Sequence, residues 1–226
     1  MIDAKKIRKY FPAIRAGRLV SNNAASTQIP VQLLDLLNKL AVQYDNVHRG
    51  QSKSSMLTTE RFEASYDTIA QFICAPSRKN IALYRNTTEA INAVMYSLLT
   101  EFKDGDNVVT TFMEHNSNYV PWYGLCNEIL PKFGIKVECR LVKFDKETGE
   151  LDLEHLKSLV DNRTKIVCCS GASNFLGTRN PIKKVREIAN NSGYVQPDGE
   201  KKSYFLVDGA QLVPNTFVDV NDLDVD

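Results

Sequence analysis

From residue 80 onward, short apolar segments alternate with segments of helical periodicity, and this alternation constrains the fold more than any other feature of the chain. The expected strands are residues 80–84, 107–112, 136–142, 165–170 and 204–207, and the helical stretches between them are 88–100, 121–131, 153–160 and 181–191. Strands that alternate with helices build βαβ units around a parallel sheet. The sequence therefore predicts an α/β fold with a mostly parallel central sheet, and the polar segment 192–203 is expected to be a surface loop or hairpin.

The first part of the chain predicts helices only. Apolar residues at 33, 34, 36, 37 and 40, with Pro30 just before them, predict one amphipathic helix. Thr58, Thr59 and Glu60 are expected to open a second helix that continues to residue 74. With 226 residues, the chain fits one large domain or most of one.

Charge and cysteine content exclude several classes of partner. Lys and Arg number 28 against 27 Asp and Glu, so the chain lacks the basic excess of a nucleic-acid-binding protein. No apolar run approaches the roughly 18 residues that a membrane helix needs. The five cysteines include the adjacent pair Cys168 and Cys169, which favours reduced thiols over disulfides. We expect a cytoplasmic protein without nucleic-acid or membrane partners.

Dense polar clusters follow four of the expected strands. Their sequences are "RNTTEAIN", "MEHNSNYVPW", "GASNFLGTRNPI" and "DGAQ". In open α/β sheets, ligands bind outside the carboxyl ends of the strands. Because parallel strands share one such edge, the four clusters predict a common site. No GxGxxG or GxxxxGK motif follows any of these strands, which excludes a nucleotide-binding module of the usual kind.

Thr87, Thr88 and His115 each have two interpretations. Thr87 and Thr88 open a helix, where they serve as an N-cap, a phosphate site, or both. His115 lies in a loop just beyond a strand, where it is either simply solvated or stacks on a planar ligand and moves protons near neutral pH.

Asp208 ends the apolar strand "YFLV" and is the most pointed candidate. It either caps a helix over 209–215 or pairs with a cation, since a carboxylate at a buried strand tip must be compensated. The protonated ring nitrogen of pyridoxal phosphate is such a cation, and Gln211 would then reach the phenolic oxygen of the ring. Asn174 either forms an Asx turn or hydrogen-bonds a substrate carboxylate or a ring oxygen.

Five segments carry a resemblance to a known family. They are "NVHRG" (46–50), "RNTTEAIN" (85–92), "MEHNSNYVPW" (113–122), "SNFLGTRNPI" (173–182) and "LVDGAQLVPN" (206–215). Together they resemble the fold-type I, class V pyridoxal-phosphate enzymes, most closely the cysteine desulfurase and selenocysteine lyase branch. The resemblance implies the large domain of that fold over residues 21–226, with an N-terminal arm over residues 1–20.

The resemblance also implies roles for individual residues. The cofactor phosphate would be held by Thr87 and Thr88. The ring nitrogen would pair with Asp208, and the phenolic oxygen with Gln211. The remaining residues are His115, which would stack on the ring, Asn174, beside substrate and ring oxygen, and His48, near the substrate entrance. These enzymes are homodimers that act on small amino acids, and some pass sulfur to an acceptor protein.

The sequence departs from the family pattern in three ways. Asn86 replaces a usual glycine, Asn22 replaces a common aspartate, and the segment 195–203 is longer than usual. The resemblance places the lysine that binds the cofactor covalently roughly eight residues past Asp226. The nucleophilic cysteine and the carboxylate-binding arginine would also follow Asp226. We therefore expect a truncated portion of a longer enzyme.

The expected activity is release of sulfur or selenium from L-cysteine or L-selenocysteine, with L-alanine as the other product. A cysteine of the enzyme would attack the substrate sulfur and form a persulfide. Other class V activities remain open, namely an aminotransferase, an epimerase or a kynureninase-like lyase. A catalytically silent fragment that binds cofactor or a partner subunit is a further alternative.

Overall fold

The computed structural model describes residues 3–226 and divides into two compact units, Met1–Ile69 and Ala70–Asp226. The first unit contains the short helices α1 (Ala4–Arg8) and α2 (Pro12–Arg15), the helix α3 (Val31–Gln43) and most of α4 (Lys53–Phe72). Helix α3 confirms the helix expected after Pro30. No helix among the described residues is long and apolar enough to cross a membrane.

Helix α4 begins at Lys53, earlier than expected. The Ser52 side chain accepts a hydrogen bond from the Ser55 amide at 3.0 Å, as an N-terminal cap does. Thr58 instead lies inside the helix, where its hydroxyl donates to the Ser54 carbonyl at 2.8 Å. The prediction that Thr58 opens this helix was wrong, because an internal threonine can satisfy its hydroxyl on the preceding turn.

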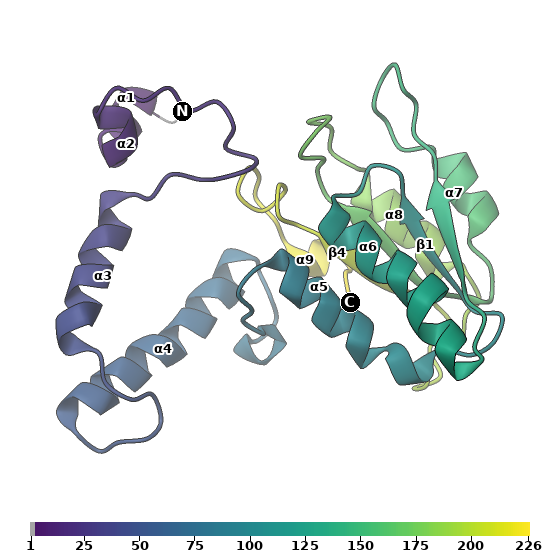
Figure 1. Cartoon of the computed structure of the whole chain (residues 1–226), viewed down its shortest axis with the longest axis horizontal. Coiled ribbons are helices and arrows are strands. Elements are labelled where there is room, and N and C mark those ends of the chain that lie inside the picture. The colour runs from purple at the N-terminus through teal and green to yellow at the C-terminus, as the bar shows by residue number, and fades with distance from the viewer. Residues whose placement is uncertain (1–2) are drawn as a thin grey trace. The chain divides into compact units, whose positions relative to one another are not determined.

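The second unit is built on a four-stranded parallel sheet, which confirms the predicted α/β class (Figure 1). The strands are β1 (Asn107–Thr111), β2 (Glu138–Val142), β3 (Thr164–Ser170) and β4 (Tyr204–Asp208), in the spatial order β2-β1-β3-β4. Its helices are α5 (Thr87–Ser97), α6 (Asn116–Gly124), α7 (Leu153–Leu159), α8 (Ile182–Asn190) and α9 (Val220–Leu223), with the 3-10 turns η1 (Arg78–Asn80) and η2 (Leu99–Glu101).

Alternate side chains of each strand enter two different apolar cores. Val108, Ile166 and Cys168 pack with α5 and α6, whereas Val109, Val167 and Cys169 pack with α7 and α8. This alternation follows from the two-residue period of a strand. It places the adjacent Cys168 and Cys169 on opposite faces of the sheet. All five cysteines are free thiols, as the sequence predicted.

The strand expected at 80–84 is absent from the described structure. Residues 81–84 have no regular secondary structure and pair with no strand of the described chain, and Leu83 and Tyr84 are exposed. A strand depends on a partner that supplies backbone hydrogen bonds, and the apolar composition of this segment says nothing about that partner. The helix expected at 121–131 begins earlier, as α6, and continues into a π-helical turn, η3 (Leu125–Ile129), and a 3-10 turn, η4 (Leu130–Phe133).

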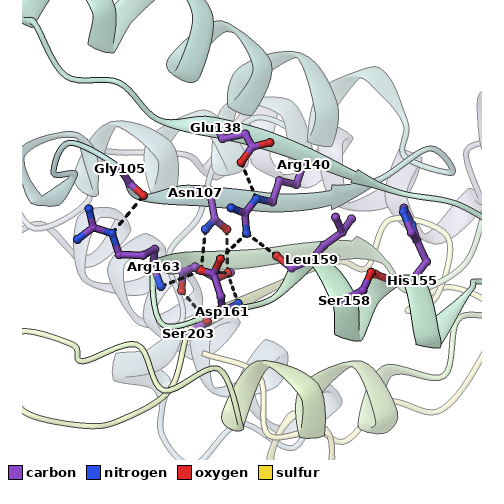
Figure 2. A network of polar contacts seen from close by, with 11 residues as sticks. Gly105, Asn107, Glu138, Arg140, His155, Ser158, Leu159, Asp161, Arg163 and Ser203 are labelled. Carbon is purple, nitrogen blue, oxygen red and sulfur yellow. Dashed lines mark hydrogen bonds and ion pairs between the residues drawn. The ribbon is translucent and has the colours of Figure 1, made fainter.

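A polar network joins the amino ends of the strands, opposite the predicted site (Figure 2). Asp161 accepts hydrogen bonds from Asn107 Nδ2 at 3.0 Å and from Arg140 Nη1 at 2.7 Å. Although partial burial opposes it, the hydrogen bond from Arg140 holds the pKa of Asp161 below its ordinary value. These contacts link the beginning of β1 and the side chain of Arg140 in β2 to the segment before β3.

Candidate active site

Three of the four predicted polar clusters share one edge of the sheet. β1 ends at Thr111, β3 at Ser170 and β4 at Asp208, and the three strands are neighbours and parallel. Ser170 and Asp208 are register partners, and the Gly171 amide donates to the Asp208 carbonyl at 2.8 Å. The fourth cluster lies at the beginning of α5 and follows the unpaired segment 81–84 instead of a strand.

Asp208 is a nearly buried carboxylate without a cation in the described chain. The residue is 6% exposed, and its Oδ1 accepts a hydrogen bond from the Ala210 amide at 2.9 Å. Neither Lys, Arg nor His forms an ion pair with it within residues 3–226. Residues 210–215 form a series of turns, so the alternative that Asp208 caps a helix over 209–215 is wrong. A carboxylate in such surroundings requires a positive partner.

The N-terminus of α5 lies beside this carboxylate. Thr87 and Asp208 line the same cavity of about 420 Å³, together with Ile91 and the turn at Gly209 and Ala210. The first amides of a helix have no acceptor within it and attract anions. This cavity therefore combines an anion-attracting helix end with an uncompensated carboxylate.

Asn86, and not a threonine, caps α5. Its side-chain oxygen accepts from the Glu89 amide at 2.9 Å, and the helix begins at Thr87. The prediction of a threonine cap was wrong because the cap must precede the first helical residue, and Asn is as good a cap as Thr. Both threonines are left in the first turn, where their amides and hydroxyls are available to an anion.

His115 and Asn174 line a second cavity, of about 340 Å³. His115 caps α6 through Nδ1, which lies 3.2 Å from the Ser117 amide and 2.8 Å from the Ser117 hydroxyl. Asn174 is exposed. The Asx turn considered for Asn174 is replaced by a turn at Ser173, whose hydroxyl accepts from the Leu176 amide at 3.1 Å. A serine one residue earlier satisfies the same turn.

The remaining predicted residues lie outside these two cavities. Thr88 is exposed in the first turn of α5, and Gln211 is half-buried, with its carbonyl bound to the Asn215 side chain at 2.7 Å. His48 belongs to the first unit, where Nε2 contacts Glu63 Oε1 at 2.8 Å. No residue of the described chain lines both cavities, so Thr87 and Asp208 form one group and His115 and Asn174 form another.

Glu114 is a residue that the sequence analysis missed. It lines the second cavity beside His115, and its two carboxylate oxygens accept four hydrogen bonds. Burial of the carboxylate raises the pKa of Glu114, although these hydrogen bonds act in the opposite direction. Its position directly before His115 could have pointed to a role in the site. Its hydrogen-bond partners in β1 and β3, however, come close to it only in the folded sheet.

Comparison with known proteins identifies the family of the chain. The family model described as aminotransferase class V matches residues 20–226. The chain is 38% identical over 208 residues to a cysteine desulfurase of Haloferax volcanii, covering 91% of this chain and 45% of that protein. It is 37% identical to a probable cysteine desulfurase of a Synechocystis species, covering 99% of this chain and 51% of that protein. The chain thus spans about half the length of these curated relatives.

A solved structure shows the same fold. The apo structure of a cysteine desulfurase from Thermococcus onnurineus NA1 matches with a TM-score of 0.87 and 28% identity, covering 100% of this chain and 52% of that one. This likeness confirms the expected fold class, the large domain of the fold-type I enzymes. Since the family model covers nearly the whole sequence, the chain belongs to the class V aminotransferase family.

Proposed function

We propose that this chain is the pyridoxal-phosphate-binding part of a cysteine desulfurase-like enzyme. The observation that carries the proposal is Asp208, a nearly buried carboxylate without a cationic partner in the described chain, beside the N-terminus of α5. Pyridoxal phosphate has one group for each feature, a protonated ring nitrogen for the carboxylate and a phosphate for the helix end. The residues present therefore fit this cofactor.

Each residue of the site has a defined task in this proposal. Asp208 keeps the ring nitrogen protonated, and the first turn of α5, with Thr87 and Thr88, binds the phosphate. His115 lies against the ring and exchanges protons with the substrate through Nε2, since Nδ1 is held by Ser117. When bound, the cofactor supplies an electron sink for the bond cleavage.

Asn174 and Gln211 complete the polar surroundings in the proposal. Asn174 is on the same cavity as His115 and hydrogen-bonds the substrate or the ring oxygen. Gln211 follows Asp208 by three residues and binds the phenolic oxygen. We further propose that His48 lies near the substrate entrance and that residues 1–20 form an N-terminal arm.

The proposed substrate is L-cysteine or L-selenocysteine, and the products are L-alanine and the released sulfur or selenium. The support for this choice comes from the curated relatives, several of which are named cysteine desulfurase or probable cysteine desulfurase at 33–38% identity. Because the chain covers about half of them, the activity is proposed for the full-length protein. We also propose a cytoplasmic homodimer that passes sulfur to an acceptor protein.

Cofactor binding by the Asp208→Asn variant tests the proposal. A hydrogen bond to a charged group contributes about 1.5–3 kcal/mol, so Kd for pyridoxal phosphate should rise about 10- to 150-fold. The titration follows cofactor absorbance and fluorescence, with the exposed Asp35→Asn as the matched control. Equal affinity in the two variants would remove Asp208 from the site.

Product analysis of the full-length protein tests the substrate. L-Cysteine should yield L-alanine and persulfide or sulfide in equal amounts. Racemised amino acid alone, or an oxo acid with transfer of the amino group, would assign the protein to another activity of the same family. His115→Ala should slow turnover by about 100-fold or more. Loss of a stacked ring contributes only about 0.5–1.5 kcal/mol to cofactor affinity, so Kd should change much less.

A further inference from the structure

Glu114 joins three elements around the candidate site. Its Oε1 accepts from the Thr111 hydroxyl at 2.6 Å and from the Ser170 amide at 2.9 Å. Its Oε2 accepts from the Ser170 hydroxyl at 2.7 Å and from Asn118 Nδ2 at 2.6 Å. Thr111 ends β1, Ser170 ends β3 and Asn118 belongs to α6. One carboxylate thus connects both strand ends with the helix that His115 caps.

The connections continue to both groups of the candidate site. On one side, Ser170 is the register partner of Asp208, and the next residue, Gly171, donates its amide to the Asp208 carbonyl at 2.8 Å. On the other side, Glu114 is bonded covalently to His115, and the Asn118 N–H donates to the His115 carbonyl at 2.9 Å. Glu114 is therefore the shared neighbour of the two cavities.

The surroundings of Glu114 require acceptors at both of its oxygens. The Ser170 amide can only donate, and Asn118 presents its NH₂ group because its Oδ1 accepts from Trp122 Nε1 at 3.3 Å. The Thr111 hydroxyl accepts from the Met113 amide at 3.0 Å, so it also presents its proton to Glu114. An amide at position 114 would place an NH₂ group against Asn118 or Ser170. A carboxylate is the side chain that satisfies all four donors.

We propose that Glu114 is a positioning residue of this site, whose carboxylate holds the His115 loop at the end of β3 and through Ser170 sets the place of Asp208. Its effect on the cofactor rests on the proposed function, but its effect on His115 does not. Glu114 touches neither ring nor substrate in this assignment. It acts by keeping the imidazole and the Asp208 carboxylate in a fixed arrangement before the cofactor binds.

The first test needs no cofactor. In the 226-residue chain, Glu114→Gln should shift the imidazole NMR signals of His115 while those of His48 and His155 stay in place. The single tryptophan, Trp122, is a second reporter, because Asn118 links it to Glu114. Its emission should change in the same variant. The exposed Glu128→Gln is the matched control and should leave both signals unchanged.

The second test measures pyridoxal-phosphate affinity of the same variants. Glu114→Gln should raise Kd at least about 5-fold relative to Glu128→Gln. Unchanged His115 signals in Glu114→Gln would overturn the assignment, whatever the affinity. Shifted His115 signals with Kd within about 2-fold of the control would overturn its part in the cofactor site. If the parent chain binds no cofactor, the proposed function fails, and the His115 signals alone decide the role of Glu114.

Ser170→Ala covers the case in which Glu114→Gln does not fold. It removes one of the four hydrogen bonds and leaves the backbone bond of Ser170 to Glu114 in place. The same His115 shift is expected, smaller in size, together with far-UV circular dichroism equal to that of the parent chain. His115 signals identical to those of the parent chain in this variant would overturn the proposal.

Discussion

Two carboxylates at the same sheet edge, Glu114 and Asp208, have opposite surroundings. Glu114 accepts four hydrogen bonds from three residues of the chain, whereas Asp208, although nearly buried, has the Ala210 amide and no cation of the described chain. A buried carboxylate with a full set of hydrogen-bond donors has a structural role, whereas a buried carboxylate without a cationic partner is a candidate to bind a positively charged group of a ligand. This difference separates the positioning residue from the residue proposed to bind the ring.

The raised pKa of Glu114 predicts how its contribution to stability depends on pH. The four hydrogen bonds favour the ionised carboxylate, but the cost of burying its charge is larger, so the folded protein holds this proton more tightly than the unfolded chain does. The contribution is therefore fully present below the unfolded pKa of about 4.3 and is lost as pH rises through the higher folded pKa. Relative to Glu114→Gln, the parent chain should lose about 1.4 kcal/mol for each pH unit that separates the folded pKa from the unfolded pKa.

Urea titrations at a series of pH values measure this effect. The free energy of unfolding of the parent chain, minus that of Glu114→Gln, should fall as pH rises from about 4 and then level off. The Glu128→Gln variant should follow the parent chain at every pH. Parallel curves for the parent chain and Glu114→Gln would contradict the raised pKa.

At the scale of elements, the residue that caps α5 determines which donors of its first turn remain for the proposed phosphate. Asn86 caps the helix through the Glu89 amide, and Glu89 Oε2 in turn accepts from the Arg85 amide at 2.8 Å. These contacts satisfy donors at the helix end without using the threonine side chains. A glycine at this position could hold the same turn but would have no side-chain acceptor to offer.

Two substitutions at Asn86 distinguish the stability that its side-chain cap contributes from the stability that the backbone turn contributes. Asn86→Ala should lower the free energy of unfolding by about 1 kcal/mol, because alanine neither caps nor favours the turn. Asn86→Gly should cost only a few tenths of a kcal/mol, since glycine is accepted at a helix N-cap. Chemical denaturation gives both values. An equal loss in the two variants would mean that the Asn86 side chain does not stabilise α5.

At the scale of the whole molecule, lysines are absent from the candidate site as the structure describes it. No lysine of residues 3–226 lines the cavity of Asp208 or that of His115. Lys165 is the lysine most deeply enclosed in the core, with 1% exposure, and its Nζ lies 2.7 Å from the Glu101 carbonyl and 3.6 Å from Asp106. Its burial lowers its pKa, but it lies near the start of β3, at the opposite end of the sheet from the site.

Reduction with borohydride should therefore give no single lysine adduct in this chain. After incubation with pyridoxal phosphate, intact-mass analysis should show at most low, scattered labelling of exposed lysines. Peptide mapping identifies the sites, and free pyridoxal phosphate with an unrelated protein of similar lysine content is the control. One dominant adduct on a lysine of this chain, coupled to turnover of cysteine, would show that the catalytic centre does not lie at the assigned residues.

The sequence by itself determined the features that depend on local pattern. Alternation of apolar and helical segments predicted the parallel sheet and helices α7 and α8, and apolar periodicity after Pro30 predicted α3, because side-chain period is a property of neighbouring residues. The polar clusters at strand ends predicted the shared edge that holds Asp208 and His115. The family resemblance rests on the same segments, and the comparisons confirm it.

Only the tertiary structure decided which groups meet. Residues 81–84 have a strand-like sequence, but pairing depends on a partner elsewhere, and the described chain provides none. Glu114 has an ordinary sequence context, and its four donors come together because β1, β3 and α6 end or begin at one place. Thr87 and Asp208, far apart along the chain, share a cavity for the same reason. Contacts between distant segments follow from the order and register of the strands, and the local sequence pattern specifies neither of these.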